Sequence, residues 1–175
     1  MSTTQNVLLK KMLVLSALSL VDKIDGRKKL QKIIYLVNSL GWNVFNDFRF
    51  YLYGPYSDLL FYELQNLKEA KLMNESESNR SYSYTITEKG NSLLNILKGK
   101  INESLESKTI ALVKKLNSFS SEDLEIMASL YYLSIELNII DNNQLIDQLH
   151  YRKPHIEKEK IQEALVIFDI IRNVA

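Results

Sequence analysis

The sequence is marked first by what it lacks: its 175 residues include no cysteine, only two histidines and only five glycines. Without cysteine the chain offers no disulfide, no thiolate nucleophile and no cysteine zinc site, a composition that suits a cytoplasmic protein. The two histidines, His150 and His155, flank Pro154 and cannot share a helix face at the spacing of a metal-binding pair. The scattered glycines form no phosphate-binding loop. We therefore expect neither a metal ion nor a cofactor.

Long apolar runs are also missing. The longest, residues 12–21, has ten residues including two serines, which is too short to cross a bilayer. It follows Lys10 and Lys11 as a signal sequence would, but Asp22 and Lys23 come next and no small-residue cleavage site is present. We expect a buried helix here and no membrane association.

Catalytic motifs are absent as well. No serine lies in a nucleophile motif, and acidic pairs such as Glu122 with Asp123 are typical of helix starts. A site assembled from distant residues leaves no trace in a single sequence, so motif searches cover only part of the enzyme classes. On this basis we expect a protein that is not an enzyme.

Charge is divided unevenly along the chain. Residues 1–100 carry 14 Lys and Arg against 9 Asp and Glu, whereas residues 101–175 carry 8 against 12. The first part is therefore +5 and the second −4, although the whole chain is nearly neutral. Such a split is typical of a protein with one anion-binding face, and it also arises by chance on a solvated surface.

The first half of the chain alternates helix and strand signals. Apolar residues on more than one side of residues 4–22 predict a buried helix, and residues 27–40 predict an amphipathic one capped by Asp25 and ended by Gly41. Alternation over residues 48–53 predicts a strand that turns at Gly54 and Pro55. Ser57 then caps a helix over residues 58–71, residues 72–86 form a hairpin, and Thr87 caps a helix that runs past Gly99 toward Asn117.

Three sequence motifs in this half occur in a fixed order: GRKKLQKIIY at residues 26–35, YGPYS at 53–57 and TEKG at 87–90. In this order they resemble the uncharacterised YwgA-like proteins, over roughly residues 7–98. That family is in turn distantly similar to the Panacea (SocA-like) antitoxin domain. The resemblance implies a winged-helix domain and assigns no catalytic residue.

The second half reads as helical throughout. Helices are expected from Ser120 or Ser121 to about residue 138, from Asp141 or Asn142 to about residue 151, and over residues 156–173. The fold class is thus mostly α with a small β-hairpin, with a winged helix-turn-helix domain at residues 1–98 and a helical region at 99–175. The C-terminal helices carry wide apolar stripes, which predict either a homodimer or closure of these helices on each other and on the first helix.

Two functions fit this pattern. The first is a DNA-binding transcriptional regulator, because free N–H groups and several cations at one helix start make a natural phosphate site. These cations oppose the helix dipole, at about 0.3–1 kcal/mol each, so something other than local stability favours them. The alternatives for the same cations are a solvated helix end and an acidic protein partner. The candidate nucleic-acid contacts are Arg27, Lys28, Lys29, Lys32, Gln65, Lys68, Arg80 and Lys89.

The second function is a protein interaction module, antitoxin-like by the distant resemblance or defence-associated, which would use the aromatic strand and turn at residues 48–55 and the acidic helical region after residue 100. The helix in the recognition position argues for it, because Gln65, Lys68 and Lys71 are mixed there with Asp58 and Glu63. A base-reading helix usually presents basic and amide side chains instead. The feature that separates the two functions is whether the basic residues converge on one exposed face.

Overall fold

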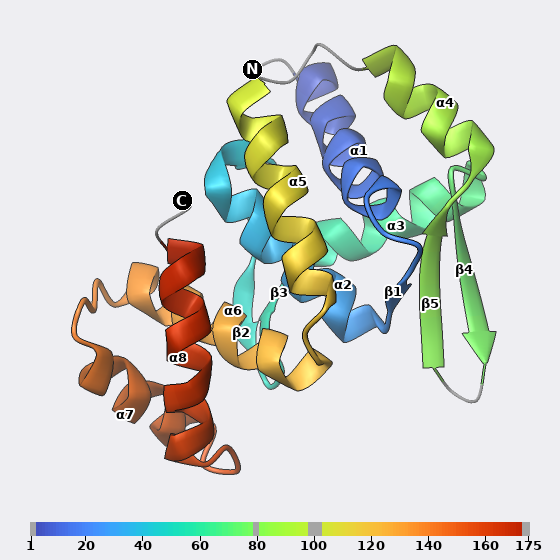
Figure 1. Ribbon diagram of the computed structural model, residues 1–175. Helices are drawn as coiled ribbons and strands as arrows, with labels where there is room; N and C mark the ends of the chain where they lie inside the picture. Colours follow the sequence, from blue (N-terminus) through green and yellow to red (C-terminus); the bar gives the residue numbers. More distant parts are fainter. Residues whose placement is uncertain (1–2, 79–80, 98–102, 173–175) are drawn as a thin grey trace.

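The computed structural model describes residues 3–78, 81–97 and 103–172 (Figure 1). The first part of the chain contains, in order, α1 (Thr3–Ser19), β1 (Ile24–Asp25), α2 (Arg27–Val37), the π-helical turn η1 (Asn38–Trp42), β2 (Arg49–Tyr51), β3 (Gly54–Tyr56), α3 (Asp58–Glu69), β4 (Met73–Ser78), β5 (Ser81–Ile86) and α4 (Glu88–Leu97). The second part contains α5 (Glu103–Asn117), α6 (Ser121–Glu136), α7 (Asn142–Arg152) and α8 (Lys158–Arg172).

The expected class, mostly α with a small β-hairpin, is confirmed. Strands β4 and β5 form the long hairpin, and β1 pairs with β5 on its other edge, so the antiparallel sheet has the order β1-β5-β4. A second, separate hairpin joins β2 and β3. This hairpin stands between α2 and α3, where a helix-turn-helix has a turn of three or four residues. The assignment to a winged helix-turn-helix therefore stays a prediction.

The middle of helix α1 is buried on every side, as its sequence predicts. The four consecutive residues from Met12 to Leu15 are fully buried, and four successive positions of a helix point in all directions around its axis. α1 packs against α3, α4, α5 and β5 (Figure 1). Each such side chain contributes about 1.5–3 kcal/mol through its removal from water, so this helix organises the core.

The predicted cap of α2 is wrong. Asp25 lies in β1, where it pairs with Ser83, and its carboxylate contacts Lys23 at 3.2 Å. The N-cap residue is Gly26, with a φ of 99° and no side-chain hydrogen bond to the helix. Strand pairing explains the difference: the N–H of Gly26 donates to the carbonyl of Tyr82 at 2.6 Å, which fixes the chain at the edge of the sheet.

The predicted turn at Gly54 and Pro55 is also displaced. Both residues belong to β3, with Tyr51 opposite Gly54 and Phe50 opposite Pro55, and the turn is formed by Leu52 and Tyr53. A two-stranded ribbon has only edge strands, which are the strands that tolerate a proline. The register therefore places two large apolar residues at the tip of the β2–β3 hairpin.

The segment from α3 to β5 agrees with the sequence. Ser57 caps α3 by accepting from the N–H of Leu60 at 2.9 Å. The Asp47 carboxylate supports the cap, since it accepts from the Ser57 hydroxyl at 2.5 Å and from the Leu59 N–H at 2.9 Å. α3 ends at Glu69, two residues early, and β4 and β5 lie within the predicted hairpin.

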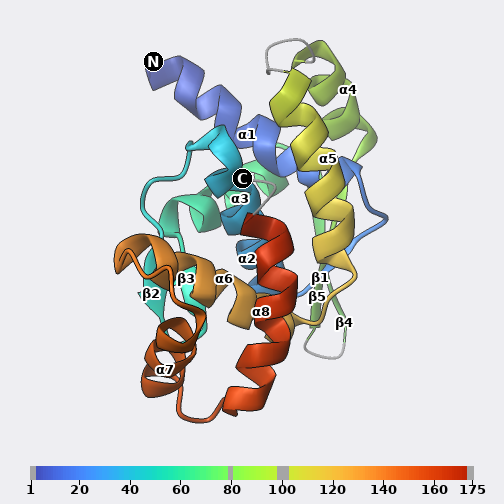
Figure 2. The same ribbon diagram turned by 60° about the vertical axis from the view of Figure 1, so that its left-hand side comes forward.

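The C-terminal helices fold back on the first half of the chain. α4 and α5 are separate helices that run in opposite directions (Figure 1), where one helix toward Asn117 was expected. α6 packs on α2 and also on α7 and α8 (Figure 2), and its apolar residues as far as Leu133 are buried or partly buried there, whereas Ile135 is 64% exposed. The boundary expected near Gly99 falls in residues 98–102, outside the described part, and stays a prediction, as does the homodimer.

Candidate binding pocket

The basic start of α2 turns inward more than its sequence suggests. Lys28 donates to Glu125 at 2.9 Å, and Lys29 donates to the carbonyl of Asn117 at 2.6 Å. Lys32 was expected at an exposed helix start, but its side chain is fully buried and donates to the carbonyl of Pro55 at 2.6 Å. The reason is packing: the helix face that carries these lysines lies against α5, α6 and β3.

Arg27 is the most open of the four basic residues. Its guanidinium lies 3.7 Å from the centroid of the Tyr82 ring, and one of its nitrogens lies 3.7 Å from Glu75. About half of the side chain, 49%, remains exposed. Because Tyr82 and Glu75 belong to the β4–β5 hairpin, Arg27 links α2 to the sheet while part of its side chain stays accessible.

Three other predicted contacts belong to the same region or to the end of α3. Lys68 pairs with Glu75 at 2.9 Å, and Gln65 lines a cavity of about 130 Å³ next to that carboxylate. Burial raises the pKa of Glu75, but hydrogen bonds from Lys68 and Tyr84 outweigh it and hold the pKa below its ordinary value. Lys89 donates to the carbonyl of Ala70 at 2.8 Å. Arg80 lies outside the described residues.

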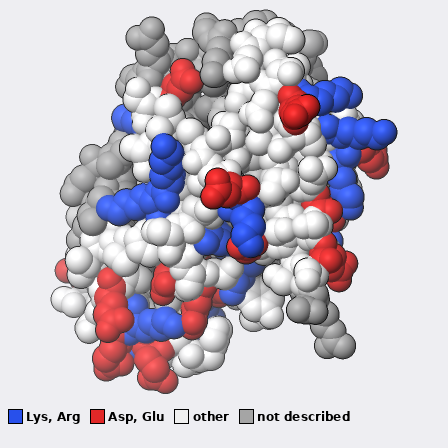
Figure 3. All heavy atoms as spheres, turned by 45° about the vertical axis from the view of Figure 1, so that its right-hand side comes forward, with Lys and Arg blue, Asp and Glu red and all other residues white. Residues whose placement is uncertain are grey.

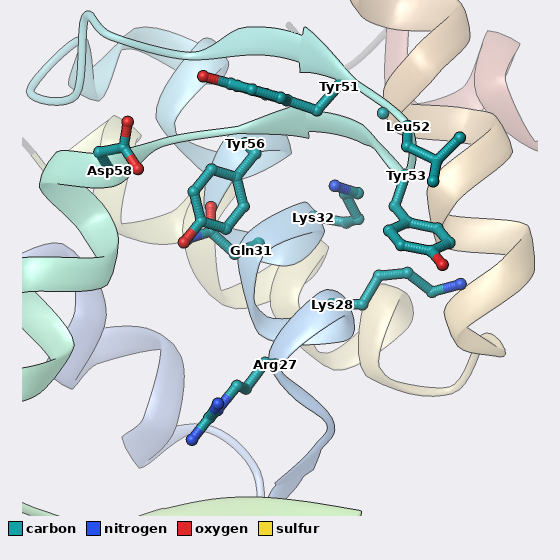
Figure 4. Close-up of a pocket in the computed structure, with 10 residues that line it drawn as sticks. Arg27, Lys28, Gln31, Lys32, Tyr51, Leu52, Tyr53, Tyr56 and Asp58 are labelled. Carbon is teal, nitrogen blue, oxygen red and sulfur yellow. The ribbon is translucent and has the colours of Figure 1, made fainter.

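The main cavity of the described structure lies between the first turns of α2 and the β2–β3 hairpin (Figure 4). Its volume is about 460 Å³, and its walls are chiefly apolar. Tyr56 and Tyr53 stand on either side of it, and Lys32 lies at the back between them. The lining residues are Arg27, Lys28, Gln31, Lys32, Tyr51, Leu52, Tyr53, Gly54, Tyr56 and Asp58.

A buried charge cluster supports the back of this pocket. Glu125 of α6 accepts from Lys28 at 2.9 Å and from Lys153, the C-cap of α7, at 2.5 Å. Lys153 also donates to the carbonyl of Leu52 at 2.5 Å. Burial raises the pKa of Glu125, but the hydrogen bonds from Lys153 and Lys28 more than compensate and lower it. The cluster therefore contains three amines, including Lys32, and one carboxylate.

The same cluster holds the β2–β3 hairpin in place. Lys32 and Lys153 bind the carbonyls of Pro55 and Leu52, on both sides of the turn. Gly54 allows close approach to α6: it has a φ of +77°, and a Cβ atom there would lie 2.5 Å from the Ser129 hydroxyl. The hairpin backbone is thus fixed from beneath while its tip faces outward.

Sequence reasoning missed Glu125 and Lys153. One signal was available for Glu125, because it interrupts the apolar run around Leu124 and Ile126, and a charge on a buried helix needs a partner. Nothing local marks its partners, which lie 97 and 28 residues away along the chain. The aromatic strand and turn were predicted as the surface of an interaction module, but their alternation does not reveal a cavity.

Lys32 makes the stability of the fold depend on pH. Burial lowers its pKa from 10.5 to about 7; Glu125 opposes the shift, and Lys153 and Lys28 add to it. Between these two pKa values the unfolded chain binds the extra proton, so the burial penalty is full below about pH 7 and fades as the pH rises. We expect the free energy of unfolding of the wild type, relative to Lys32→Met, to increase by roughly 1 kcal/mol per pH unit above pH 7. Urea unfolding at several pH values measures this, and a flat difference contradicts the burial of a titrating amine.

In the described ranges, no group of three or more acidic or histidine side chains is placed to hold a metal ion. His150 is engaged with the carbonyl of Ile156 through Nδ1 at 2.9 Å. No helix within the described residues combines the length and the apolar character needed to cross a membrane.

Comparison with known proteins identifies relatives of this chain. The uncharacterized protein YwgA of Bacillus subtilis (strain 168) is 29% identical over 115 residues, which are 63% of this chain and 66% of the relative. The match thus spans just under two thirds of that protein's length, and it confirms the resemblance to YwgA-like proteins; the Panacea similarity stays a prediction. Residues 58–160 match the family model described as a domain of unknown function (DUF4364). This match covers more than half of the chain and includes Asp58, Glu125 and Lys153. The chain belongs to the DUF4364 family.

Proposed function

We propose that this protein is an interaction module that binds a short segment of a partner protein at the pocket and at the adjoining hairpin tip. The observation that carries the proposal is the exposure of large apolar side chains around the opening. Leu52 is 70% exposed, and Tyr51 and Tyr53 are about half exposed. Exposed apolar groups gathered beside a cavity are typical of interaction sites, in which tyrosine is enriched.

The rigidity of the hairpin supports this proposal. Lys32 and Lys153 fix the backbone of the turn, so its side chains are presented in a defined geometry before any partner arrives. A preorganised surface loses less entropy on binding, and tyrosine has only two rotatable side-chain bonds to immobilise. α3 extends the apolar surface with Leu59 and Tyr62, both exposed, directly after β3.

The partner segment can be described by its chemistry. A cavity of about 460 Å³ accommodates one or two large apolar side chains rather than a folded domain. Arg27 and Lys28 line it together with a single carboxylate, that of Asp58, so the charge at its rim is net positive. We infer an acidic segment with an aromatic or aliphatic anchor residue, because opposite charge favours encounter and an apolar anchor fills the cavity.

Nucleic-acid binding is the second candidate. It is favoured by the basic excess of residues 1–100 and by the half-exposed Arg27. Against it, Lys28, Lys29 and Lys32 all have partners inside the protein, which a phosphate would have to displace. Figure 3, which brings the side of β4 and β5 forward, shows Lys and Arg beside Asp and Glu rather than one continuous basic surface. For these reasons we place the protein partner first.

The test uses a library of random peptides displayed on phage and selected on the whole protein. We expect enriched sequences that combine a large apolar residue with neighbouring Asp or Glu. Leu52→Ser is expected to weaken the binding of a selected peptide about tenfold, because a buried apolar anchor contributes on the order of 1–2 kcal/mol. Val166→Ser on α8 is the matched control: Val166 is 69% exposed and does not line the pocket. Equal losses in both variants would contradict the proposed site.

The nucleic-acid candidate is measured in parallel by fluorescence polarisation with labelled duplex and single-stranded DNA. If this candidate is right, a plot of the logarithm of the binding constant against the logarithm of the salt concentration has a slope of about −0.9 for each phosphate neutralised. Arg27→Gln should then make this slope less steep by about one phosphate contact. Alanine at Arg27, Lys28 and Lys29 together is unsuitable for this test. It removes the Lys28 partner of Glu125 and the Lys29 contact with α5. Salt-dependent DNA binding without any selected peptide would reverse the order of the two candidates.

A further inference from the structure

The buried amine of Lys32 lacks a counter-ion. Its side chain is 1% exposed and makes one hydrogen bond, to the carbonyl of Pro55. Among the described residues no carboxylate lies within 4.0 Å of its Nζ atom; the Glu125 carboxylate is taken by Lys28 and Lys153. A buried charge normally requires an ionic partner, so this amine either loses its proton or binds an anion.

The groups that face Lys32 from each neighbouring element set the charge of the pocket. α2 contributes Lys28, α6 contributes Glu125, the C-cap of α7 contributes Lys153, and the hairpin contributes the carbonyl of Pro55. Asp58 lines the pocket as well; Figure 4 places it on the far side of Tyr56 from Lys32. With all amines protonated, one negative charge opposes three positive ones at the back of the cavity.

We propose that the back of this pocket is a carboxylate-binding site, in which a ligand carboxylate accepts hydrogen bonds from Lys32 and Lys28 while the apolar part of the ligand lies between Tyr53 and Tyr56. This inference rests on the proposed function and names the group by which the partner is recognised. A singly charged carboxylate suits the site better than a phosphate, because Lys32 is the described pocket cation without an ionic partner, whereas Lys28 pairs with Glu125 and Arg27 lies near Glu75.

The ligand carboxylate can come from two sources, and the same hydrogen bonds would recognise it in both. It is either an acidic side chain or chain terminus of a protein segment, or the acid group of a free small molecule with an aromatic or aliphatic body. The cavity is large enough for a single residue with its terminal carboxylate. Probes of this size therefore test the chemistry before the natural ligand is known.

Proton uptake accompanies this binding. Because burial lowers the Lys32 pKa to about 7, much of the amine is neutral in the empty pocket above that pH. A carboxylate next to it favours the charged form, so ligand binding draws in a proton under those conditions. Affinity is then highest below about pH 7 and falls by up to about tenfold per pH unit above it, until the pKa of the bound state is reached.

The experiment compares N-acetyl-tyrosine with N-acetyl-tyrosine amide, which differ only in the carboxylate. Isothermal calorimetry on the whole protein is run at about pH 6 and about pH 8.5, in buffers of different ionisation enthalpy. We expect the acid to bind at least roughly tenfold more tightly than the amide at the lower pH, with proton uptake at the higher pH. Lys32→Met, which keeps an unbranched apolar stem, removes both the preference and the uptake.

Lys29→Met is the matched control, because Lys29 lies on the same helix with its amine on Asn117 and does not line the pocket. It is expected to keep the preference for the acid, and circular dichroism establishes that both variants are folded. The inference is overturned if neither probe binds, if acid and amide bind equally, or if the preference survives Lys32→Met.

The result separates this inference from the proposed function. If the selected peptides need no acidic group, the interaction module is supported and the carboxylate site is contradicted. If the free acid binds but no peptide is selected, the carboxylate site is supported as a site for a small molecule and the protein partner is contradicted.

Discussion

Replacement of Glu125 by Gln is expected to destabilise the protein by about 3–5 kcal/mol, the usual cost of leaving buried charges uncompensated. The wild-type carboxylate lies between Lys28 at 2.9 Å and Lys153 at 2.5 Å, and it is 3% exposed. Gln keeps the shape but loses the negative charge, so the buried Lys153 amine and the amine of Lys28, whose side chain is 34% exposed, repel one another without compensation. Urea unfolding at neutral pH measures the loss.

Glu122→Gln is the matched control for this substitution. Glu122 lies one turn earlier on α6 and pairs with Lys160 at 2.6 Å, but both side chains are substantially exposed. Exposed pairs contribute about 0–1 kcal/mol, so the control should change stability little. Adding Lys153→Met to Glu125→Gln should recover part of the loss, because it removes one of the unpaired charges. Equal effects of the two Gln substitutions would show that the cluster is hydrated rather than buried.

The second large effect is expected from Gly90→Ala. A Cβ atom on Gly90 would lie 2.1 Å from the backbone carbonyl oxygen of Leu72 and 2.9 Å from a side-chain carbon of Ile86. That carbonyl also accepts the Thr87 N–H at 3.1 Å, so it cannot move without loosening the start of α4. We expect destabilisation by about 2–3 kcal/mol from this overpacking.

Gly90→Ala is informative because its expected effect on stability is opposite in sign to the usual effect of this substitution. Within a helix, Gly→Ala ordinarily stabilises by up to about 1 kcal/mol, because alanine has the higher helix propensity. Asn91→Ala, at the next and exposed position of α4, is the control and should stay within about 0.5 kcal/mol. Thermal and urea unfolding of both variants measure this, and a stabilising Gly90→Ala would contradict the close packing of α4 on Leu72 and Ile86.

The parts of the fold that were predictable are those with local signals. The Ser57 cap, the alternation in β5 and the Thr87 start of α4 are each encoded within a few residues, and each is found. The Asp25 cap failed because Asp25 pairs with Ser83, a residue far along the chain. The turn at Gly54 failed because the register of the β2–β3 hairpin pairs Gly54 with Tyr51 and places it against Ser129 of α6. Local propensity carries no information on such pairing.

The candidate site was predictable only in part. The sequence identified the basic start of α2, but it read those side chains as exposed. Lys28 and Lys32 lie four residues apart, so they share one helix face, and the structure packs that face on α6. The contacts of Lys153 with Leu52 and Glu125 join segments 101 and 28 residues apart, which one sequence cannot reveal.

The central claim is that the pocket between α2 and the β2–β3 hairpin is where this protein binds its partner. The most direct measurement is a titration of the isotope-labelled whole protein with a selected peptide, followed by amide chemical shifts in solution NMR. We predict the largest shifts in residues 27–32 and 51–58, with little change in α7 or α8 beyond Lys153. Largest shifts on α8 or at the β4–β5 hairpin, with the pocket residues unmoved, would contradict the account.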